Sequence, residues 1–356
     1  MTEITLEQVT LPGHRQAPPE LIEIYQLRSR TVELRAVTYG AIVTSVMVPN
    51  RDGVWENVVL GHGAVERYVE NRAYLGAVIG RYAGRIAGAR FELDGQTHLL
   101  DANDGPHHRH GGWRGFDQHV WTATTAADAE SSSVSFWRLS SDGEAGYPGA
   151  LGVRVSYTLT AAGEIIIDYE ARAHQPTVVN LTQHTYFNLS GNSRRDARDQ
   201  QLTIHADRFM PVGPGLLPTG ALEPVAGTPF DFRTPVRIAD RLAMRHEQLT
   251  LAGGFDHIWE VARHSANALV PAARLHDPRS GRTLVVSTTE PGLQFYDGHR
   301  LGAPANDAGA DFPPGFGICL QTQHYPDSPH QPAFPSTVLR PGEPYRSQTT
   351  WKLGVD

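Results

Sequence analysis

Residues 31–47 read TVELRAVTYGAIVTSVM, and this stretch predicts an all-β fold. Val, Ile, Thr and Tyr favour strands, and here they alternate with small and polar residues on both sides of Gly40, which interrupts the run as a turn does. Residues 90–100 repeat the pattern as a hairpin, with Asp94 and Gly95 as its two-residue turn. Both stretches indicate antiparallel strands joined by tight turns.

Further strand patterns follow at spacings of roughly 8–12 residues, separated by turn residues, as in a sandwich or barrel. They lie at residues 133–139, 153–159, 283–288 and 317–322, with a second hairpin at 158–172. Helical patterns are few: residues 236–248 form the best of them, while residues 304–314 indicate a long loop. The sequence has neither an internal repeat nor a linker-like tract. We therefore expect residues 1–356 to form a single domain, one large antiparallel β-sandwich.

The composition restricts the partners of this chain. The net charge is −7, the pI is about 6.2 and no basic run is present, so a nucleic-acid partner has no electrostatic support and a neutral small molecule suits the balance better. The single cysteine, Cys319, excludes an intrachain disulfide. No stretch approaches ~18 apolar residues, so we expect no membrane span. The polar residues 1–8 do not resemble an export signal, which favours a cytoplasmic protein; an exported protein whose signal has been removed is the alternative.

Two glycine-rich segments carry charged or metal-ligating side chains. GRYAGR at residues 80–85 places Arg81 and Arg85 four apart, and the donor fork of a guanidinium suits vicinal hydroxyl groups; a solvated surface loop is the alternative. GPHHRHGG at residues 105–112 has three histidines close together, as a metal site would. The chain has no CxxC, HExxH or facial-triad spacing, so we expect no metal. The flanking glycines instead indicate a tight loop that brings one histidine to a ligand.

Two later segments hold more polar and aromatic residues than a sandwich core requires. On a regular strand, NLTQHTYFNL at residues 180–189 places His184, Tyr186 and Asn188 on one face. A histidine among aromatic residues is either a satisfied core residue or a group suited to proton transfer near neutral pH. In GICLQTQHYPD at residues 317–327, an apolar strand runs into polar residues, as at the rim of a pocket.

These motifs follow one another in an order that is known from a protein family. GRYAGRI, RHGG, GFD, NLTQHTYFNL, GTPFDF, GGFDH, CLQTQHYPDSPHQPAFPSTVLRPGE and RSQTTWKL resemble the aldose 1-epimerase (galactose mutarotase) family over residues 31–353. The resemblance implies a galactose mutarotase-like super-sandwich, a monomer or homodimer, and no cofactor. It implies that the chain interconverts the α and β anomers of aldoses such as galactose and glucose. A base takes the proton of the anomeric O1 and an acid protonates the ring oxygen O5, which opens the ring.

The resemblance also assigns roles to individual residues. The family's acid is the histidine of the NLTxH motif, here His184, and the histidine of HGG, here His110, helps to hold O5. From their positions we add Tyr186 and Phe295 as walls for the apolar face of the sugar. The motifs GRYAGR, GGFDH and GLQFY supply the groups expected to bind sugar hydroxyls: Arg85, Asp256 and Gln294.

Position 321 departs from the family pattern. The family's general base is the glutamate of CLETQ, whereas this chain has Gln321. An amide cannot accept a proton at any useful pH, and loss of a general base typically lowers the rate by about 10²–10⁴. The expected catalytic pair is therefore His184 with Gln321, in which the amide still hydrogen-bonds O1.

Several explanations fit a glutamine at this position. Gln321 is either an engineered substitution made to trap a bound sugar, or the natural residue of a protein that has lost catalysis and kept binding. A third explanation is a natural enzyme that uses the same pocket for another isomerisation or elimination. Asp256 or His324 is the candidate for a replacement base, although regular strand alternation points His324 away from Gln321. Gly84, where the family commonly has Asn, and Gln183 are smaller departures.

Overall fold

The computed structural model describes residues 2–11, 19–69, 71, 73–263, 265, 267–302 and 312–356. Three antiparallel sheets hold most of the strand residues, as the strand patterns predicted. Most of the loop predicted at residues 304–314 lies outside the described residues.

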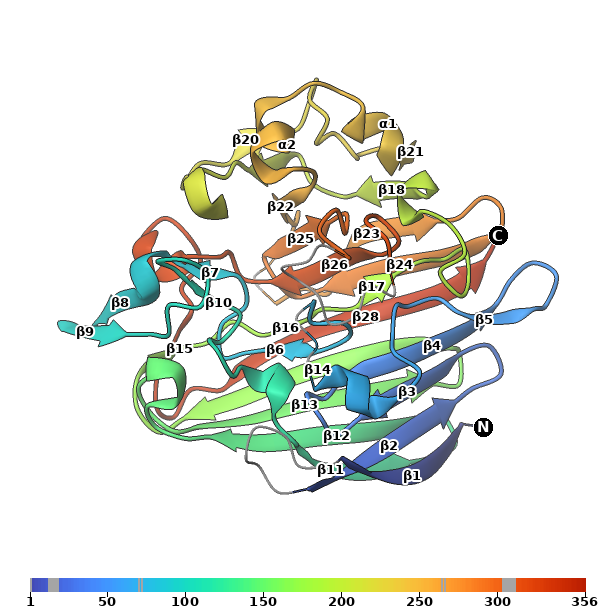
Figure 1. Ribbon diagram of the computed structural model, residues 1–356, viewed down its shortest axis with the longest axis horizontal. Helices are drawn as coiled ribbons and strands as arrows, with labels where there is room; N and C mark the ends of the chain where they lie inside the picture. The colour runs from blue at the N-terminus through green and yellow to red at the C-terminus, as the bar shows by residue number, and fades with distance from the viewer. Residues whose placement is uncertain are drawn as a thin grey trace.

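The largest sheet, called here the large sheet, has nine strands. In spatial order they are β11 (Thr122–Ala127), β12 (Ser131–Ser140), β13 (Leu151–Thr160), β14 (Glu164–Ala173), β28 (Tyr345–Val355), β24 (Arg282–Thr288), β23 (Val270–His276), β18 (Gln201–Ile204) and β21 (Val236–Arg237). The C-terminal strand β28 therefore lies in the middle of the sheet, between β14 and β24. Segments far apart in the sequence are joined there into one layer (Figure 1).

The second sheet, called here the pocket sheet, has six strands. They are β17 (Tyr186–Phe187), β26 (Ile318–Gln323), β25 (Gly292–Tyr296), β22 (Asp256–Glu260), β19 (Arg208–Met210) and β20 (Glu223–Pro224). The third sheet has five strands, β1 (Glu3–Leu11), β2 (Glu20–Arg28), β3 (Glu33–Val37), β4 (Val43–Pro49) and β5 (Trp55–Asn57).

Short pairs of strands complete the architecture. They are β7 (Arg85–Ile86) with β10 (His108–Arg109), β8 (Arg90–Leu93) with β9 (Gln96–Leu99), β6 (Val78–Ile79) with β16 (Thr182–Gln183), and β15 (Thr177–Val178) with β27 (Val338–Leu339). Residues 85–109, which contain β7 to β10, form a lobe at the left of Figure 1 and are called here the β7–β10 lobe.

The predicted turns are confirmed. Residues 31–47 form β3 and β4, with Gly40 and Ala41 at positive φ between them. The turn of the β8–β9 hairpin has φ of +50° at Asp94 and +77° at Gly95, which is the left-handed backbone that two-residue hairpins require.

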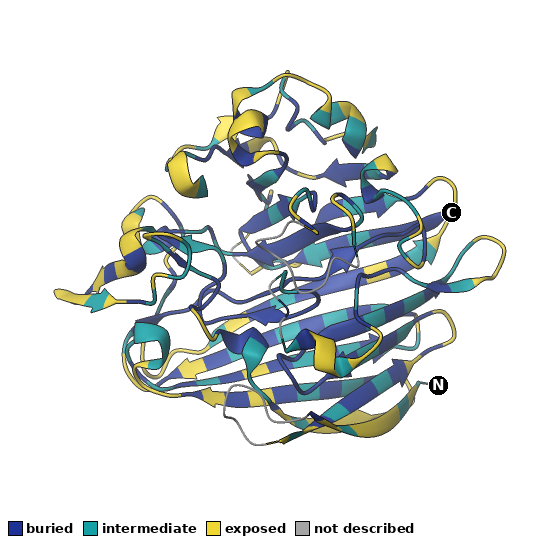
Figure 2. Cartoon of the chain, viewed as in Figure 1, coloured by how far each residue is buried: buried dark blue, intermediate teal, exposed yellow. Residues whose placement is uncertain are grey.

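One apolar core joins the three sheets. It includes Leu34 of β3, Val155 of β13, Leu320 of β26 and Trp351 of β28, all of them buried. Buried and more exposed residues alternate along β13 and β14, so one face of each strand packs inward (Figure 2). The sandwich expected from the sequence rests on this shared core.

The single helix predicted at residues 236–248 is wrong. Val236 and Arg237 pair with β18 and extend the large sheet as β21. The helical residues belong to two short helices, α1 (Ile238–Leu242) and α2 (Glu247–Ala252). The ring of His246 accepts a hydrogen bond from the Gln248 N–H and so caps the start of α2, which separates it from α1.

Candidate active site

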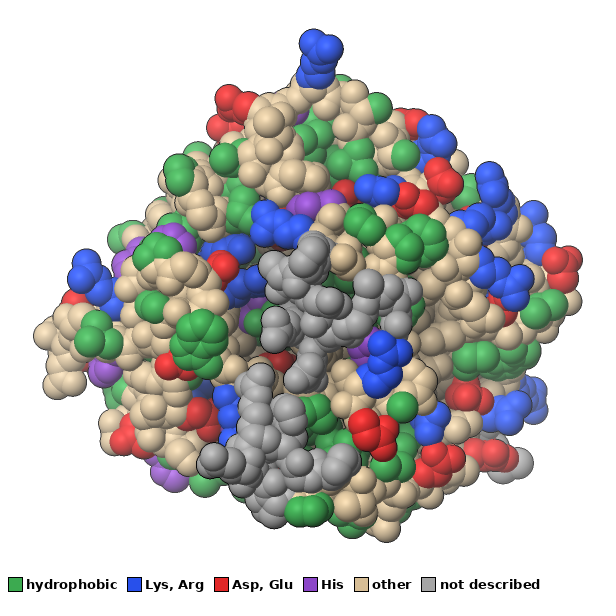
Figure 3. Space-filling model, viewed as in Figure 1, with side chains coloured by type: hydrophobic (Ala, Val, Ile, Leu, Met, Phe, Trp, Pro, Cys, Tyr) green, Lys and Arg blue, Asp and Glu red, His purple; other side chains and the backbone are tan. Residues whose placement is uncertain are grey.

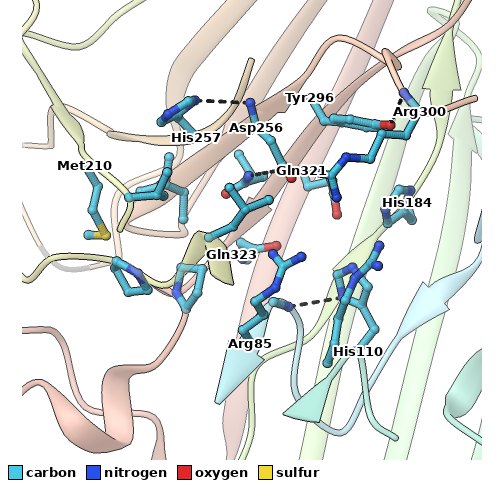
Figure 4. A pocket seen from close by; sticks show the side chains of 18 of the residues that line it. Arg85, His110, His184, Met210, Asp256, His257, Tyr296, Arg300, Gln321 and Gln323 are labelled. Atoms are coloured by element: carbon cyan, nitrogen blue, oxygen red, sulfur yellow. Dashed lines mark hydrogen bonds between the residues drawn. The ribbon is translucent and has the colours of Figure 1, made fainter. Parts of the chain in front are cut away.

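A pocket opens on one face of the pocket sheet, beside the β7–β10 lobe. Successive side chains of a strand point to opposite faces, so alternate residues of three neighbouring strands share the floor of the pocket. These are Asp256 and Ile258 of β22, Gln294 and Tyr296 of β25, and Gln321 and Gln323 of β26. Figure 4 shows Arg85 and His110 on one side of the hollow, facing Asp256, Tyr296 and Gln321 on the other, with His184 at its end. Met210, Val212, Leu216 and Pro218 add apolar lining.

The structure brings nearly all of the predicted site residues to this pocket. Those that line it are Arg85, His110, His184, Tyr186, Asp256, Gln294 and Gln321. Phe295 does not, and its prediction as a wall for the sugar is wrong. It lies between two residues that face the pocket, so strand alternation points its ring into the core, where it stacks on Phe255 with ring centroids 5.1 Å apart. Tyr296 forms part of the wall instead.

His184 stands between β16 and β17 and is enclosed by rings. The centroids of Tyr186, His110 and Tyr74 lie 5.1, 5.5 and 5.7 Å from its own. Its Nδ1 lies 3.6 Å from Cys319 Sγ. Burial, reinforced by the positive charge of Arg109, lowers the pKa of His184 to about 3. The imidazole is therefore neutral at pH 7 in the empty pocket.

The strand expected through residues 180–189 is interrupted at His184. As a consequence, Asn188 does not share the pocket with His184 and Tyr186: its Nδ2 donates to two backbone carbonyls, those of Arg195 and Phe316, at 2.7 Å. Tyr186 remains at the pocket, and its hydroxyl donates to the carbonyl of Ala73 at 3.0 Å.

His110 is held by its backbone and by one ring hydrogen bond. Its Nδ1 accepts from the Gly84 N–H at 3.1 Å, so the proton of the neutral ring is on Nε2. Burial, together with the charge of Arg109, lowers the pKa of His110 well below its usual value. The next residue, Gly111, has φ of +88°, and a Cβ there would lie 1.9 Å from the Gly80 carbonyl oxygen. Glycine therefore permits the tight loop that the sequence predicted.

The other polar residues of the two glycine-rich segments are structural. The guanidinium of Arg81 is buried and donates to Ser140 and to nearby backbone carbonyls. His108 bonds Tyr147 Oη at 2.7 Å and the Asp101 carbonyl at 2.8 Å. Within the described ranges, the structure gathers no group of three or more His, Cys, Asp and Glu side chains able to hold a metal ion.

Two arginines stand side by side at the pocket. Arg85 of β7 and Arg109 of β10 are direct partners in the strand register, and both line the pocket. Arg85 Nε donates to Asp104 Oδ2 at 2.6 Å. The guanidinium carbon of Arg109 lies 5.5 Å from the centroid of the Tyr74 ring. Arg109 is therefore a pocket residue that the sequence analysis missed.

Asp256 and Gln294 form a hydrogen-bonded pair on the floor. Gln294 Nε2 donates to Asp256 Oδ1 at 2.8 Å. Burial alone would raise the pKa of Asp256, but Arg85 and Arg109 outweigh burial and lower it, so this group is a carboxylate at neutral pH. It is the one acidic side chain among the described residues that line the pocket.

Gln321 lies opposite Gln294 in the strand register. Its side chain is 4% exposed, and its Oε1 has no hydrogen-bond partner within the part of the chain that the structure describes. A buried acceptor without a partner typically costs about 1–3 kcal/mol. A donor group of a ligand would satisfy it.

His324 is occupied elsewhere. Its Nδ1 bonds Glu290 Oε2 at 2.6 Å, and its side chain is not among those that line the pocket. Of the two replacement bases considered, only Asp256 lines the pocket. Gln183, a further departure from the family pattern, is buried and donates to the Gly76 carbonyl and to Tyr157 Oη.

The helices of the described residues are all too short to cross a lipid bilayer.

Comparisons with known proteins identify the family of this chain. The family model described as Aldose 1-epimerase matches residues 23–352. The galactose mutarotases of Rattus norvegicus and Homo sapiens are 43% and 44% identical over 335 residues, which is 94% of this chain and 94% of each relative. The aldose 1-epimerase of Escherichia coli (strain K12) is 38% identical over 317 residues, 88% of this chain and 90% of the relative. The solved structure of galactose 1-epimerase from Lactobacillus acidophilus NCFM has a TM-score of 0.86 and 29% identity, with 99% of both chains covered. The chain belongs to the aldose 1-epimerase family.

Proposed function

We propose that the chain binds an aldose in this pocket and interconverts its α and β anomers by opening and closing the pyranose ring. The observation that carries the proposal is the convergence of His184, His110 and Asp256 on one pocket, each from the family motif that the sequence contains. Arg85 and Gln294 join them there as further hydrogen-bonding groups.

In the proposed mechanism, each side chain acts at a stated atom of the sugar. Arg85, Asp256 and Gln294 bind hydroxyl groups and fix the ring. His110 donates from Nε2 to O5, in keeping with the tautomer that the Gly84 N–H imposes. The protonated form of His184, a small fraction at neutral pH, delivers the proton that breaks the bond between C1 and O5, and the ring is left neutral. The open aldehyde rotates about C1–C2 and closes on its other face.

Removal of the O1 proton is the step for which this pocket lacks the family's general base. Gln321 accepts a hydrogen bond from O1 through its unpartnered Oε1 but cannot take the proton. The proton leaves to Asp256, the one carboxylate among the described pocket residues, or to water. We therefore expect slow catalysis, roughly 10²–10⁴ below that of a site with a carboxylate at position 321.

Sugar binding without catalysis is the second candidate. The amide of Gln321 and the neutral ring of His184 favour it, because neither group is in the protonation state that ring opening requires. Both candidates use the same pocket and differ only in the rate of anomer exchange.

Anomer-resolved NMR exchange distinguishes them. Fresh α-D-galactose and α-D-glucose are mixed with the protein, and the approach to anomeric equilibrium is compared with buffer alone. The proposal predicts faster equilibration with the protein and none of this acceleration with His184→Gln. Calorimetry on the same samples measures binding. Saturable binding without any acceleration would replace the enzyme by the binding protein, and the absence of binding would contradict both.

A further inference from the structure

The ring of Tyr74 contacts both histidines that the proposed mechanism places at the ring oxygen of the sugar. Its centroid lies 4.9 Å from that of His110 and 5.7 Å from that of His184, and the two imidazole centroids are 5.5 Å apart. These are contact distances for aromatic rings, so the three rings form a closed triangle. Tyr74 is not among the described residues that line the pocket, whereas its neighbour Ala73 is, so Tyr74 acts on a sugar only through other side chains.

The backbone at Tyr74 has an unusual conformation for an aromatic residue. Its φ is +58°, in the left-handed region that a bulky side chain rarely adopts. His110, which meets the tyrosine ring edge-on at 68°, also has a positive φ, +52°. Such backbone costs free energy and persists only where the surrounding structure enforces it. Both partners of this contact are therefore held in strained positions.

Hydrogen bonds enforce the position of Tyr74 and join it to His184. The buried side chain of Asn71 donates to the Leu75 carbonyl at 3.0 Å and accepts from the Leu75 N–H at 2.8 Å. The next N–H, that of Gly76, donates to the carbonyl of His184 at 3.1 Å. The turn that carries the tyrosine is thus bonded to the backbone of a histidine that its ring contacts.

The imidazole of His184 depends on ring packing for its orientation. Among the described residues, the side-chain atom that its Nδ1 reaches is Cys319 Sγ at 3.6 Å, and a thiol is a weak hydrogen-bonding group. Tyr186 packs on the same imidazole with centroids 5.1 Å apart. In the described part of the chain, however, Tyr74 is the aromatic residue that contacts both His184 and His110. It is therefore the group able to fix one imidazole relative to the other.

Tyr74 also contacts a cation that acts on both imidazoles. Burial raises the pKa of Tyr74 to about 12, so its ring is a neutral phenol, and the guanidinium carbon of Arg109 lies 5.5 Å from the ring centroid in a cation–π contact. Burial, followed by the charge of Arg109, lowers the pKa of His184 and of His110. Arg or Lys and His side chains are visible together beside the β7–β10 lobe (Figure 3).

We propose that Tyr74 is a positioning residue, whose ring holds the imidazoles of His110 and His184 at a fixed distance and angle so that both reach the ring oxygen of one sugar. The inference rests on the proposed function, because it concerns the two histidines assigned to that oxygen. Catalytic groups must be held within about 0.5 Å of their productive positions. The ring makes the contacts, so phenylalanine at position 74 should serve as well as tyrosine, and a side chain without a ring should not.

NMR relaxation of the histidine rings tests the proposal without reference to activity. Tyr74→Leu removes the ring and Tyr74→Phe removes only the hydroxyl. Tyr25→Leu is the control, since Tyr25 is a buried tyrosine that packs on Phe136 and does not line the pocket. In protein with ¹³C-labelled histidines, the rings of His110 and His184 should lose order in Tyr74→Leu and keep it in the other two variants. Tyr74→Gly is a second variant without a ring, and glycine adopts a positive φ without strain.

Anomer exchange of α-D-galactose is the second readout. We expect Tyr74→Leu to lower the rate at saturating sugar by roughly 10–10²-fold, because small displacements of catalytic groups cost that much, while the affinity measured by calorimetry changes only a few-fold. Tyr74→Phe and Tyr25→Leu should keep the parental rate, although Tyr25→Leu lowers the free energy of unfolding. Since Gln321 makes the parent slow, the same substitutions are also made in the Gln321→Glu protein.

Each contrary outcome has a separate meaning. Histidine rings that stay ordered in folded Tyr74→Leu or Tyr74→Gly, or an unchanged rate there, overturn the positioning role. A Tyr74→Phe variant as slow as Tyr74→Leu assigns the effect to the hydroxyl and also overturns it. An equal loss of rate in Tyr25→Leu overturns it as well, because lost stability then explains the result. If neither the parent nor Gln321→Glu exchanges anomers, the proposed function fails, and the order of the histidine rings decides the role of Tyr74.

Discussion

The charge of the side chain at position 321 affects the pKa of His184. Cys319, whose Sγ contacts the ring of His184, precedes Gln321 by two residues on the same strand face, so position 321 and the imidazole face one pocket. Burial and Arg109 lower the pKa of His184 to about 3. A carboxylate at position 321 would oppose both effects, because an anion stabilises the imidazolium. The amide therefore supplies no base and also leaves a smaller fraction of His184 protonated at neutral pH.

We predict that Gln321→Glu raises the pKa of His184. A histidine titration followed by NMR in the parent and the variant measures it directly, and the shift should bring the imidazole closer to its usual range. Gln323→Glu is the matched control, because it adds the same charge two residues further along the strand and should have a smaller effect. Equal shifts in the two variants, or no shift in either, would disprove the coupling between positions 321 and 184.

The loop between β6 and β7 requires a residue without a side chain at position 84. Gly84 has φ of +80°, and a Cβ there would lie 2.9 Å from side-chain atoms of Pro326. Its N–H donates to His110, and the next residue is Arg85. Pro326 thus occupies the space that a side chain at position 84 would need.

Substitution of two glycines separates crowding from backbone strain. Gly84→Ala and Gly95→Ala both place alanine at positive φ, +80° and +77°, but a Cβ at Gly95 has no neighbour within 4 Å. We expect Gly95→Ala to lower the free energy of unfolding by roughly 1 kcal/mol and Gly84→Ala by about 1–3 kcal/mol more. Sugar affinity, measured by calorimetry, should fall only in Gly84→Ala. Equal losses in both variants would mean that Pro326 moves aside freely.

Strands and turns were the part of the fold that the sequence predicted well, because period-two alternation and an Asp-Gly pair act locally. The helix at residues 236–248 failed because Val236 finds a partner in β18, which is distant in the sequence. The residues that the family motifs supply do line one pocket. Arg109 was missed because its position depends on the pairing of β10 with β7, and Phe295 was misplaced because the strand direction decides which of two neighbours faces the sugar.

The buried histidines of the pocket lower the free energy of unfolding of the whole protein at low pH. Burial lowers the pKa of His184 to about 3, of His257 to about 4, and of His110 well below its usual value. Between these values and about 6.5, the unfolded chain binds more protons than the folded chain. The free energy of unfolding is therefore fully present above about pH 7 and declines as the pH falls toward 4.

We expect His184→Gln to reduce this pH dependence. Each such histidine adds up to about 1.4 kcal/mol per pH unit to the slope between pH 4 and 6, so the variant should lose about that much of it. Denaturant unfolding at several pH values measures the slope, with His174→Gln as the control because His174 is exposed. An unchanged slope in His184→Gln would show that His184 is protonated in the folded protein. The single domain expected for residues 1–356 also predicts one cooperative transition.

Anomer exchange of α-D-galactose by Gln321→Glu, measured by NMR beside the parent protein, tests most directly whether position 321 and His184 form the catalytic pair. We predict a rate that is higher by roughly 10²–10⁴, with an affinity for galactose that changes by only a few-fold. A folded, galactose-binding Gln321→Glu variant that is no faster than the parent would contradict the assignment.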